Sequence, residues 1–440
     1  MIQRMLKLPK SALLAIGASL AFCGHAASAP QADGESPRLM ALYRELHAAP
    51  ELSFGETETA ARLAREIDGL GYTVTQGIGG TGLAAVMHNG AGPVLLIRTD
   101  MDALPISEDT GLPFASTVTR KTREGESQPA MHACGHDIHM ASWVGVARRM
   151  AAEKARWRGT LILVAQPAEE RVGGARAMLK DGLYARTATP THILAFHDSA
   201  AQPAGTFGWT PGPALAAVDT VDITVKGQGS HGASPQLSKD PIVTAARIVL
   251  GLQTIVSREI APEDAAVVTV GAINGGSKNN IIPDRVELKL TLRSFSDSTR
   301  VHLVEAVRRT ARGEAMAAGM SVEPDVRVSD EGANVTVNTP AFAERIAGVF
   351  RERFGAERVQ RIAPATVSED FNEFGRAAPQ AETFMFWVGA QPKAVFDAAG
   401  GDLTKMPGLH TARWAPDAAT AIPMAVDAMT AAALSVLGGR

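Results

Sequence analysis

Cysteine is scarce in this chain of 440 residues, which contains only Cys23 and Cys134. Three basic residues precede an apolar run over residues 12–22, which is too short to span a bilayer, and small residues follow it. Because this is the pattern of a secretory signal peptide, we expect residues 1–26 to be removed and the protein to be periplasmic or secreted. Cys23 would leave with that segment, so the mature chain would contain no intramolecular disulfide.

The sequence also lacks a strong excess of charge of either sign, with a net charge of −3 and 20% charged residues. That balance gives no indication of nucleic-acid binding, nor of a membrane-bound mature form. A Gly-x-Ser-x-Gly elbow is absent too, which argues against a serine hydrolase of the α/β type. The length predicts two or three domains.

Apolar runs of strand length alternate with helical spacing in the first half of the chain. Strands are predicted at 94–97, 161–165 and 193–196, and helices at 138–152 and 175–181. Nearly continuous apolar strands are typical of burial on both faces. We therefore predict an α/β fold with a mostly parallel, helix-covered sheet.

From about residue 216 the pattern changes to the order βαββαβ, which is that of a ferredoxin-like α+β unit. We expect residues 216–331 to form a domain inserted into a catalytic domain made of residues 30–215 and 332–440. Its expected strands are 218–226, 266–273, 286–295 and 322–328, and its expected helices are 241–260 and 299–318.

The densest group of chemically active side chains lies between Met131 and His139, where a thiol, three imidazoles and a carboxylate occur together. Thiolate, imidazole and carboxylate are the ligands of zinc-like ions. Cys134 and His136 are two positions apart and cannot share a helix face, so they fit a loop that enters a helix near Ile138. The alternatives are a buried cysteine beside a surface histidine, and a thiol hydrolase with Cys134 as nucleophile and His136 as base.

Further candidates follow the predicted parallel strands: Asp100 and Asp102, then Glu169 and Glu170, then His197. Open α/β sheets bind ligands along this edge, so these residues should converge on one crevice.

Each of these candidates has a simpler interpretation. One glutamate could bind a metal while its neighbour faces the substrate, or both could be a solvated surface pair. Asp100 and Asp102 could orient a metal-binding histidine or merely cap the strand. His197 and His410, considered alone, are typical core or loop histidines, and only the neighbouring metal motif favours them as ligands.

One further motif resembles a nucleotide-binding site without its structural context. Gly77-x-Gly79-x-x-Gly82 matches the dinucleotide-binding fingerprint, but a strand-like segment follows it where that fold requires a helix.

Taken together, the motifs resemble those of the N-acyl-amino-acid amidohydrolases. This family includes hippurate hydrolases, aminoacylase-like enzymes and auxin-conjugate hydrolases, and it is related to the di-zinc carboxypeptidases. The resemblance covers essentially the whole mature chain. The motifs that carry it are residues 98–105, 132–139, 166–170, 240–242, 280–284 and 368–371.

The resemblance implies a zinc-exopeptidase-like catalytic domain with an inserted lid and two divalent metal ions. Cys134 would bridge the ions and Glu169 would be the general base, with Asp100 also among the catalytic residues. His231 and Asn280 would stabilise the oxyanion, in relatives often across a dimer interface, and Arg293 would bind the substrate carboxylate. A homodimer through the lid is implied as well. The other metal ligands would be His136, Glu170, His197 and His410.

The implied reaction is hydrolysis of small N-acyl amino acids, hippurate-like or N-acetylated. The alternatives are a carboxypeptidase or dipeptidase on the same centre, and a binding protein that has lost catalysis. Zinc suits the ligand set first, with manganese, cobalt or nickel as alternatives. The sequence departs from its relatives after His197 (Asp198-Ser199-Ala200), after His410 and at residues 290–293, and we expect these departures to lie in the pocket walls.

Overall fold

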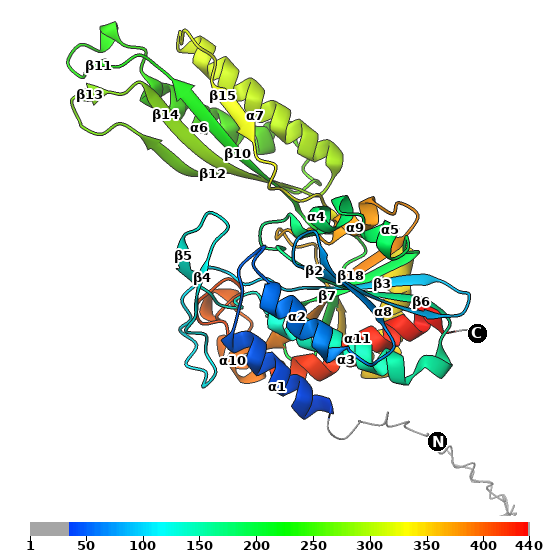
Figure 1. Cartoon of the computed structure of the whole chain (residues 1–440). Coiled ribbons are helices and arrows are strands. Elements are labelled where there is room, and N and C mark those ends of the chain that lie inside the picture. The colour runs from blue at the N-terminus through cyan, green and yellow to red at the C-terminus, as the bar shows by residue number, and fades with distance from the viewer. Residues whose placement is uncertain (1–34, 439–440) are drawn as a thin grey trace, which may run out of the picture.

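A computed structural model describes residues 35–438 of the chain, and the predicted signal peptide, residues 1–26, lies outside them. Figure 1 shows a larger body built around a central sheet and a smaller, elongated body that projects from it. The chain passes into the smaller body and returns, so segments on both sides of it in sequence complete the larger body.

The central sheet has eight strands in the order β1-β2-β6-β3-β7-β18-β8-β17. Its middle strands β6, β3, β7 and β18 are parallel, while β2, β8 and β17 run in the opposite direction. This confirms the predicted mostly parallel sheet. The strand bounds are β1 Thr73–Ile78, β2 Gly82–Asn89, β3 Val94–Asp100, β6 Gly159–Gln166, β7 His192–Pro203, β8 Phe207–Trp209, β17 Val359–Arg361 and β18 Glu382–Gln391.

Helices cover both faces of this sheet, which explains why β3 and β6 are buried at almost every position. The larger hydrophobic core lies under α1 (Glu35–Ala48), α2 (Thr57–Glu66), α3 (His136–Ala152), α8 (Pro340–Phe354) and α11 (Ala418–Leu437). A second core lies under α4 (Gly174–Lys180), α5 (Leu183–Arg186) and α9 (Asn372–Arg376) on the other face. Helix α11 is long and apolar enough to cross a membrane by length and composition alone, but here it packs as a core helix.

The glycine-rich motif at residues 77–82 forms the turn of an antiparallel hairpin between β1 and β2. A Cβ atom on Gly79 would lie 2.6 Å from the backbone nitrogen of Met178 in α4, so only glycine fits there. The glycines therefore serve a turn and a close backbone approach rather than a phosphate site.

The smaller body is an antiparallel sheet in the order β12-β14-β10-β15, covered by α6 and α7. Strand β10 alternates between buried and more exposed side chains because its other face lacks a helix layer. The side chain of Asp240 caps α6 by accepting hydrogen bonds from the backbone nitrogens of Ile242 and Val243. The bounds are β10 Ala217–Lys226, α6 Pro241–Glu259, β12 Ala266–Gly275, β14 Arg285–Ser294, α7 Asp297–Ala317 and β15 Asp325–Val328.

The two chain crossings between the bodies lie side by side. Strand β9 (Gly212–Leu215) leaves the larger body and pairs with β16 (Thr336–Asn338), which returns to it. A short hairpin on the larger body, β4 (Thr119–Lys121) with β5 (Ser127–Pro129), and helix α10 (Lys393–Ala399) complete the main elements among residues 35–438.

Two predicted boundaries were wrong. Helix α3 begins at His136 rather than near Ile138, because Gly135 adopts a left-handed conformation (φ 76°) that turns the chain directly into the helix. Strand β7 does not end before His197 but continues to Pro203, since β18 pairs with it beyond that point. Both shifts bring predicted site residues into regular elements.

Candidate functional site

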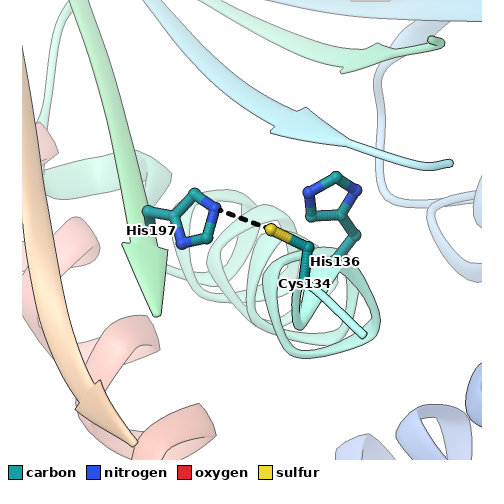
Figure 2. A group of neighbouring side chains, drawn as sticks. All are labelled: Cys134, His136 and His197. Atoms are coloured by element: carbon teal, nitrogen blue, oxygen red, sulfur yellow. Dashed lines mark hydrogen bonds between the residues drawn. The ribbon is translucent and has the colours of Figure 1, made fainter. Parts of the chain in front are cut away.

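The predicted metal-binding residues gather at the carboxyl edge of the parallel strands, where α3 begins. The Sγ atom of Cys134 lies 3.1 Å from Nε2 of His410 and 3.5 Å from Nε2 of His197. Figure 2 shows the sulfur between the rings of His136 and His197. Segments far apart in sequence thus meet at one thiol.

Two groups of donor atoms share this sulfur. Cys134, His136 and His197 form one group, and Cys134, Glu170 and His410 form the other. Within each group all donor atoms lie within 4.8 Å of one another. This spacing allows each group to hold one ion, with the thiolate common to both.

The imidazoles are oriented by backbone carbonyl groups. Nδ1 of His136 is 2.7 Å from the carbonyl oxygen of Asp102, and Nδ1 of His197 is 2.7 Å from that of Asp198. Each ring therefore donates through Nδ1 and presents the lone pair of Nε2 toward the thiol. This is the arrangement in which histidine binds metals in proteins.

Two buried polar atoms test whether a metal fits this site. Nε2 of His136 and Oε1 of Glu170 are shielded from solvent, yet neither has a hydrogen-bond partner among the described residues. Buried polar groups normally have a hydrogen-bond partner, and native proteins contain few buried polar atoms without one. A cation beside them would satisfy both, and the nitrogen, sulfur and oxygen donors suit a zinc-like ion.

His410 reaches the site through a strained backbone. Its φ angle is 62°, in the left-handed region that residues other than glycine rarely adopt. Its N–H donates to the carbonyl oxygen of Ala133 at 2.8 Å, directly beside Cys134. The strain is maintained by this contact, which ties the C-terminal loop to the thiol-bearing turn.

Two buried carboxylates hold the loop that carries Glu169 and Glu170 through hydrogen bonds to its backbone. The side chain of Asp102 accepts hydrogen bonds from the backbone nitrogens of both glutamates at 3.0 Å, and that of Glu56 accepts from Ala168 at 2.8 Å. Ala168 has a φ of 48°, so this turn is also strained. Asp102 therefore positions the loop, and Glu56 is a supporting residue that the sequence pattern did not reveal.

Asp100 was expected either to orient a metal-binding histidine or to cap its strand. Its carboxylate accepts from Nδ1 of His139 and from Arg98, both at 2.7 Å, and lies 3.6 Å from Nε2 of His136. It therefore orients His139, which is not among the predicted ligands, and approaches His136 from the metal-facing side. Burial raises the pKa of Asp100, but His136, Arg98 and His139 together hold it well below its usual range.

Most of the charged groups that shift the pKa of Glu169 are carboxylates. Burial raises the pKa of Glu169 well above its usual value, and Glu369 and Glu170 raise it further. Burial likewise raises the pKa of the Cys134 thiol, with nearby carboxylates adding to the effect. A nucleophilic thiolate is therefore disfavoured here unless a cation accompanies it, which counts against the thiol-hydrolase alternative.

These residues open into a cleft of about 710 Å³ that extends to the second sheet. Arg293 enters it from β14 and donates to the hydroxyl of Ser368 at 2.6 Å, but it has no carboxylate partner among the described residues. A half-buried guanidinium without a counter-charge is suited to bind an anionic group of a ligand. The cleft is also lined by Glu169, Leu215, Val218, Thr220, Val367, Glu369, Trp387 and Leu409.

The remaining predicted residues, His231 and Asn280, are not brought to this cleft by their own chain. His231 lies on β11 (Ser230–His231), which pairs with β13 (Ile281–Ile282) next to Asn280. Both strands lie at the end of the smaller body farthest from the central sheet (Figure 1). Neither residue lines the cleft at the metal-binding side chains.

The sequence model of peptidase family M20/M25/M40 matches residues 96–399. The hippurate hydrolase of Campylobacter jejuni is 35% identical over 335 residues, which cover 76% of this chain and 84% of that protein. The N-acetylcysteine deacetylase of Bacillus subtilis is 38% identical over 292 residues, covering 65% and 73%. The crystal structure of the YxeP protein of Bacillus subtilis, described as a dinuclear metal-binding peptidase, superposes with a TM-score of 0.73 at 30% identity, covering 92% of this chain and 99% of that one.

Proposed function

This chain belongs to peptidase family M20/M25/M40, and from that membership we propose that it hydrolyses the amide bond of N-acyl amino acids with two divalent ions bound around Cys134. The observation that carries the proposal is the pair of donor groups sharing one thiol, beside a buried glutamate at the edge of a cleft. The products would be a carboxylate and a free amino acid.

Bound at these donors, two divalent ions would supply Lewis acidity, which polarises a carbonyl group and makes a water molecule easier to deprotonate. Glu169 then acts as the general base: it accepts a proton from the water that attacks the acyl carbon and returns it to the leaving amine. Burial and the neighbouring carboxylates raise the pKa of Glu169, which increases its affinity for the proton of the attacking water. Arg293 binds the α-carboxylate of the substrate and sets its direction in the cleft.

The test is a substrate panel on protein that has been stripped with a chelator and reloaded with a single metal. N-benzoyl and N-acetyl amino acids should be hydrolysed, and activity should return only with added metal. Faster hydrolysis of dipeptides would favour the carboxypeptidase or dipeptidase alternative. No turnover in a metal-replete sample would favour a binding protein.

Zinc is the metal we propose, because a thiolate, imidazoles and a carboxylate form the ligand set that zinc prefers. Manganese, cobalt and nickel bind similar sets, so the same reloading series should include all four. The highest kcat/KM at matched occupancy would identify the functional ion.

We also propose that residues 216–331 act as a lid that closes over the catalytic domain and pairs with the lid of a second chain. An apolar groove on its outer side supports this pairing, since β12 is an unpaired edge strand beside α6. Leu250 is 71% exposed and Ile273 52% exposed there. Exposed apolar surface along an open sheet edge is typical of a protein interface.

Pairing would let His231 and Asn280 of one chain serve the metal centre of the other. The variants His231→Ala and Glu169→Gln should each be inactive alone. In mixed dimers, one centre would combine an intact Glu169 with an intact His231, and about one quarter of wild-type activity should appear after random subunit exchange. No recovery in demonstrably mixed dimers would remove the role assigned to His231.

Export is proposed from the sequence pattern of residues 1–26. N-terminal sequencing of the mature protein from fractionated cells would test it. Cleavage near residue 26 in a periplasmic or secreted fraction is the expected result.

A further inference from the structure

Asp198 is a buried carboxylate that the proposed reaction does not use. It was expected in the pocket wall, as part of the departure that follows His197. That expectation was wrong: Asp198 is 0% exposed and does not line the cleft. It is buried because β7 continues through it, paired with Val388 of β18, and its side chain faces the turn at Gly135.

Its carboxylate lies against the turn that carries the thiol. A Cβ atom built on Gly135 would lie 2.5 Å from both carboxylate oxygens, so only glycine fits between Cys134 and His136. Oδ1 is 3.2 Å from Nδ1 of His197 and 3.1 Å from Nε2 of His139. The other oxygen, Oδ2, is buried and has no hydrogen-bond partner among the described residues.

Nδ1 of His197 therefore faces two acceptors of residue 198, the backbone carbonyl oxygen at 2.7 Å and the carboxylate. The carbonyl alone is enough to fix the tautomer of His197, so the tautomer does not require the carboxylate. A carboxylate beside the outer nitrogen of a histidine makes the inner nitrogen a better metal ligand. A fully buried anion near the donor atoms also attracts a cation directly, because little solvent screens it.

We propose that Asp198 is a positioning residue for the metal centre, which raises the affinity of the ion held by Cys134, His136 and His197. It acts through His197 and the turn at Gly135, and it touches no substrate. The proposal rests on the proposed function only in requiring that this group binds an ion. It explains why the chain maintains a buried carboxylate oxygen that no protein group satisfies.

The variants Asp198→Asn and Asp198→Val test this proposal. Asparagine keeps the shape and the Oδ1 acceptor but removes the charge, while valine removes both. The matched control is Ser199→Ala, at the next buried position, whose hydroxyl accepts only from the backbone nitrogen of Ala201. Dissociation constants for Zn²⁺ and Mn²⁺ would be measured by competition with a chromophoric chelator, and the cobalt-loaded proteins would be compared by absorption spectroscopy.

Asp198→Asn should weaken one of the two binding steps by about 10–100-fold and shift the cobalt spectrum, and Ser199→Ala should do neither. The unfolding temperature separates this role from a structural one. Asparagine keeps the Oδ1 acceptor that faces His139 and His197, so metal-free Asp198→Asn should be as stable as the wild type, and only its metal-loaded transition should fall.

Metal-free variants that are destabilised, with dissociation constants within about threefold of the wild type, would show a purely structural role and overturn the proposal. If Asp198→Asn does not fold, the metal dissociation constants of Asp198→Val decide the question. The metal-binding readout needs no substrate. A failure to hydrolyse N-acyl amino acids would therefore count against the proposed function alone.

Discussion

Replacing Glu169 by glutamine should separate catalysis from metal binding. Three backbone hydrogen bonds from residues 168–170 to Glu56 and Asp102 hold the loop, and none of them involves the side chain of Glu169. Glutamine should therefore occupy the same position. It cannot accept the proton of the attacking water, and loss of a general base costs about 10²–10⁴ in rate, which is about 3–5 kcal/mol of activation free energy.

The surroundings of Glu169 add a second expectation. Burial raises its pKa, and the carboxylates of Glu369 and Glu170 oppose its negative charge. A neutral glutamine removes that repulsion, so the metal-free variant should unfold at the same temperature as the wild type or higher. Catalytic groups are often held in positions that reduce the stability of the fold, so replacing one can lower activity without lowering stability.

The assay is hydrolysis of N-benzoyl and N-acetyl amino acids by protein whose metal content is measured in the same sample. Glu169→Gln should retain two ions per chain and lose turnover. The matched control is Glu170→Gln, which should lose metal because that side chain lies among the donor atoms. Near-normal turnover of fully loaded Glu169→Gln would refute the assignment of the base.

Three further outcomes are expected. Cys134→Ala should abolish stable binding of both ions after dialysis, because the two donor groups share its sulfur; retention of two ions by elemental analysis would contradict this. Arg293→Ala should raise KM for N-acyl amino acids about 10–100-fold, the value of a lost charge-assisted hydrogen bond, and leave uncharged N-acyl amines unaffected. Burial lowers the pKa of His47, but Asp137 and Glu108 outweigh it and raise the pKa from 6.5 to about 10. The contribution of protonated His47 to the free energy of unfolding should be complete below pH 6.5 and be lost as pH rises through about 10. Urea unfolding of the wild type should show this loss of stability, and that of His47→Gln should not.

The residues at strand ends could be predicted from the sequence. Asp100 and Glu169 follow continuous apolar strands, and parallel strands bring their carboxyl ends to one edge whatever the rest of the fold does. The short spacing of Cys134 and His136 also carries local information, since both must leave one turn together. In these places, periodicity and chain direction are sufficient.

Residues placed by long-range pairing could not be predicted in the same way. His410 reaches the thiol through a backbone hydrogen bond to Ala133 and a left-handed conformation, and no local pattern indicates either. The segment after His197 has little strand propensity, yet pairing with β18 extends β7 through it and buries Asp198. Tertiary contacts overrode local preference there, as they commonly do in strands.

The outer contacts of the metal-binding histidines determine how this centre responds to its surroundings. Nδ1 of His136 and Nδ1 of His197 each donate to a backbone carbonyl, and neither carbonyl gains or loses a proton. The carbonyl of Asp198 belongs to β7, and that of Asp102 lies just beyond the end of β3, so neither moves independently of the sheet. The rings are therefore oriented before any ion binds. Metal binding therefore costs little additional conformational entropy in these side chains. The affinity for metal depends chiefly on the charged groups around the two rings.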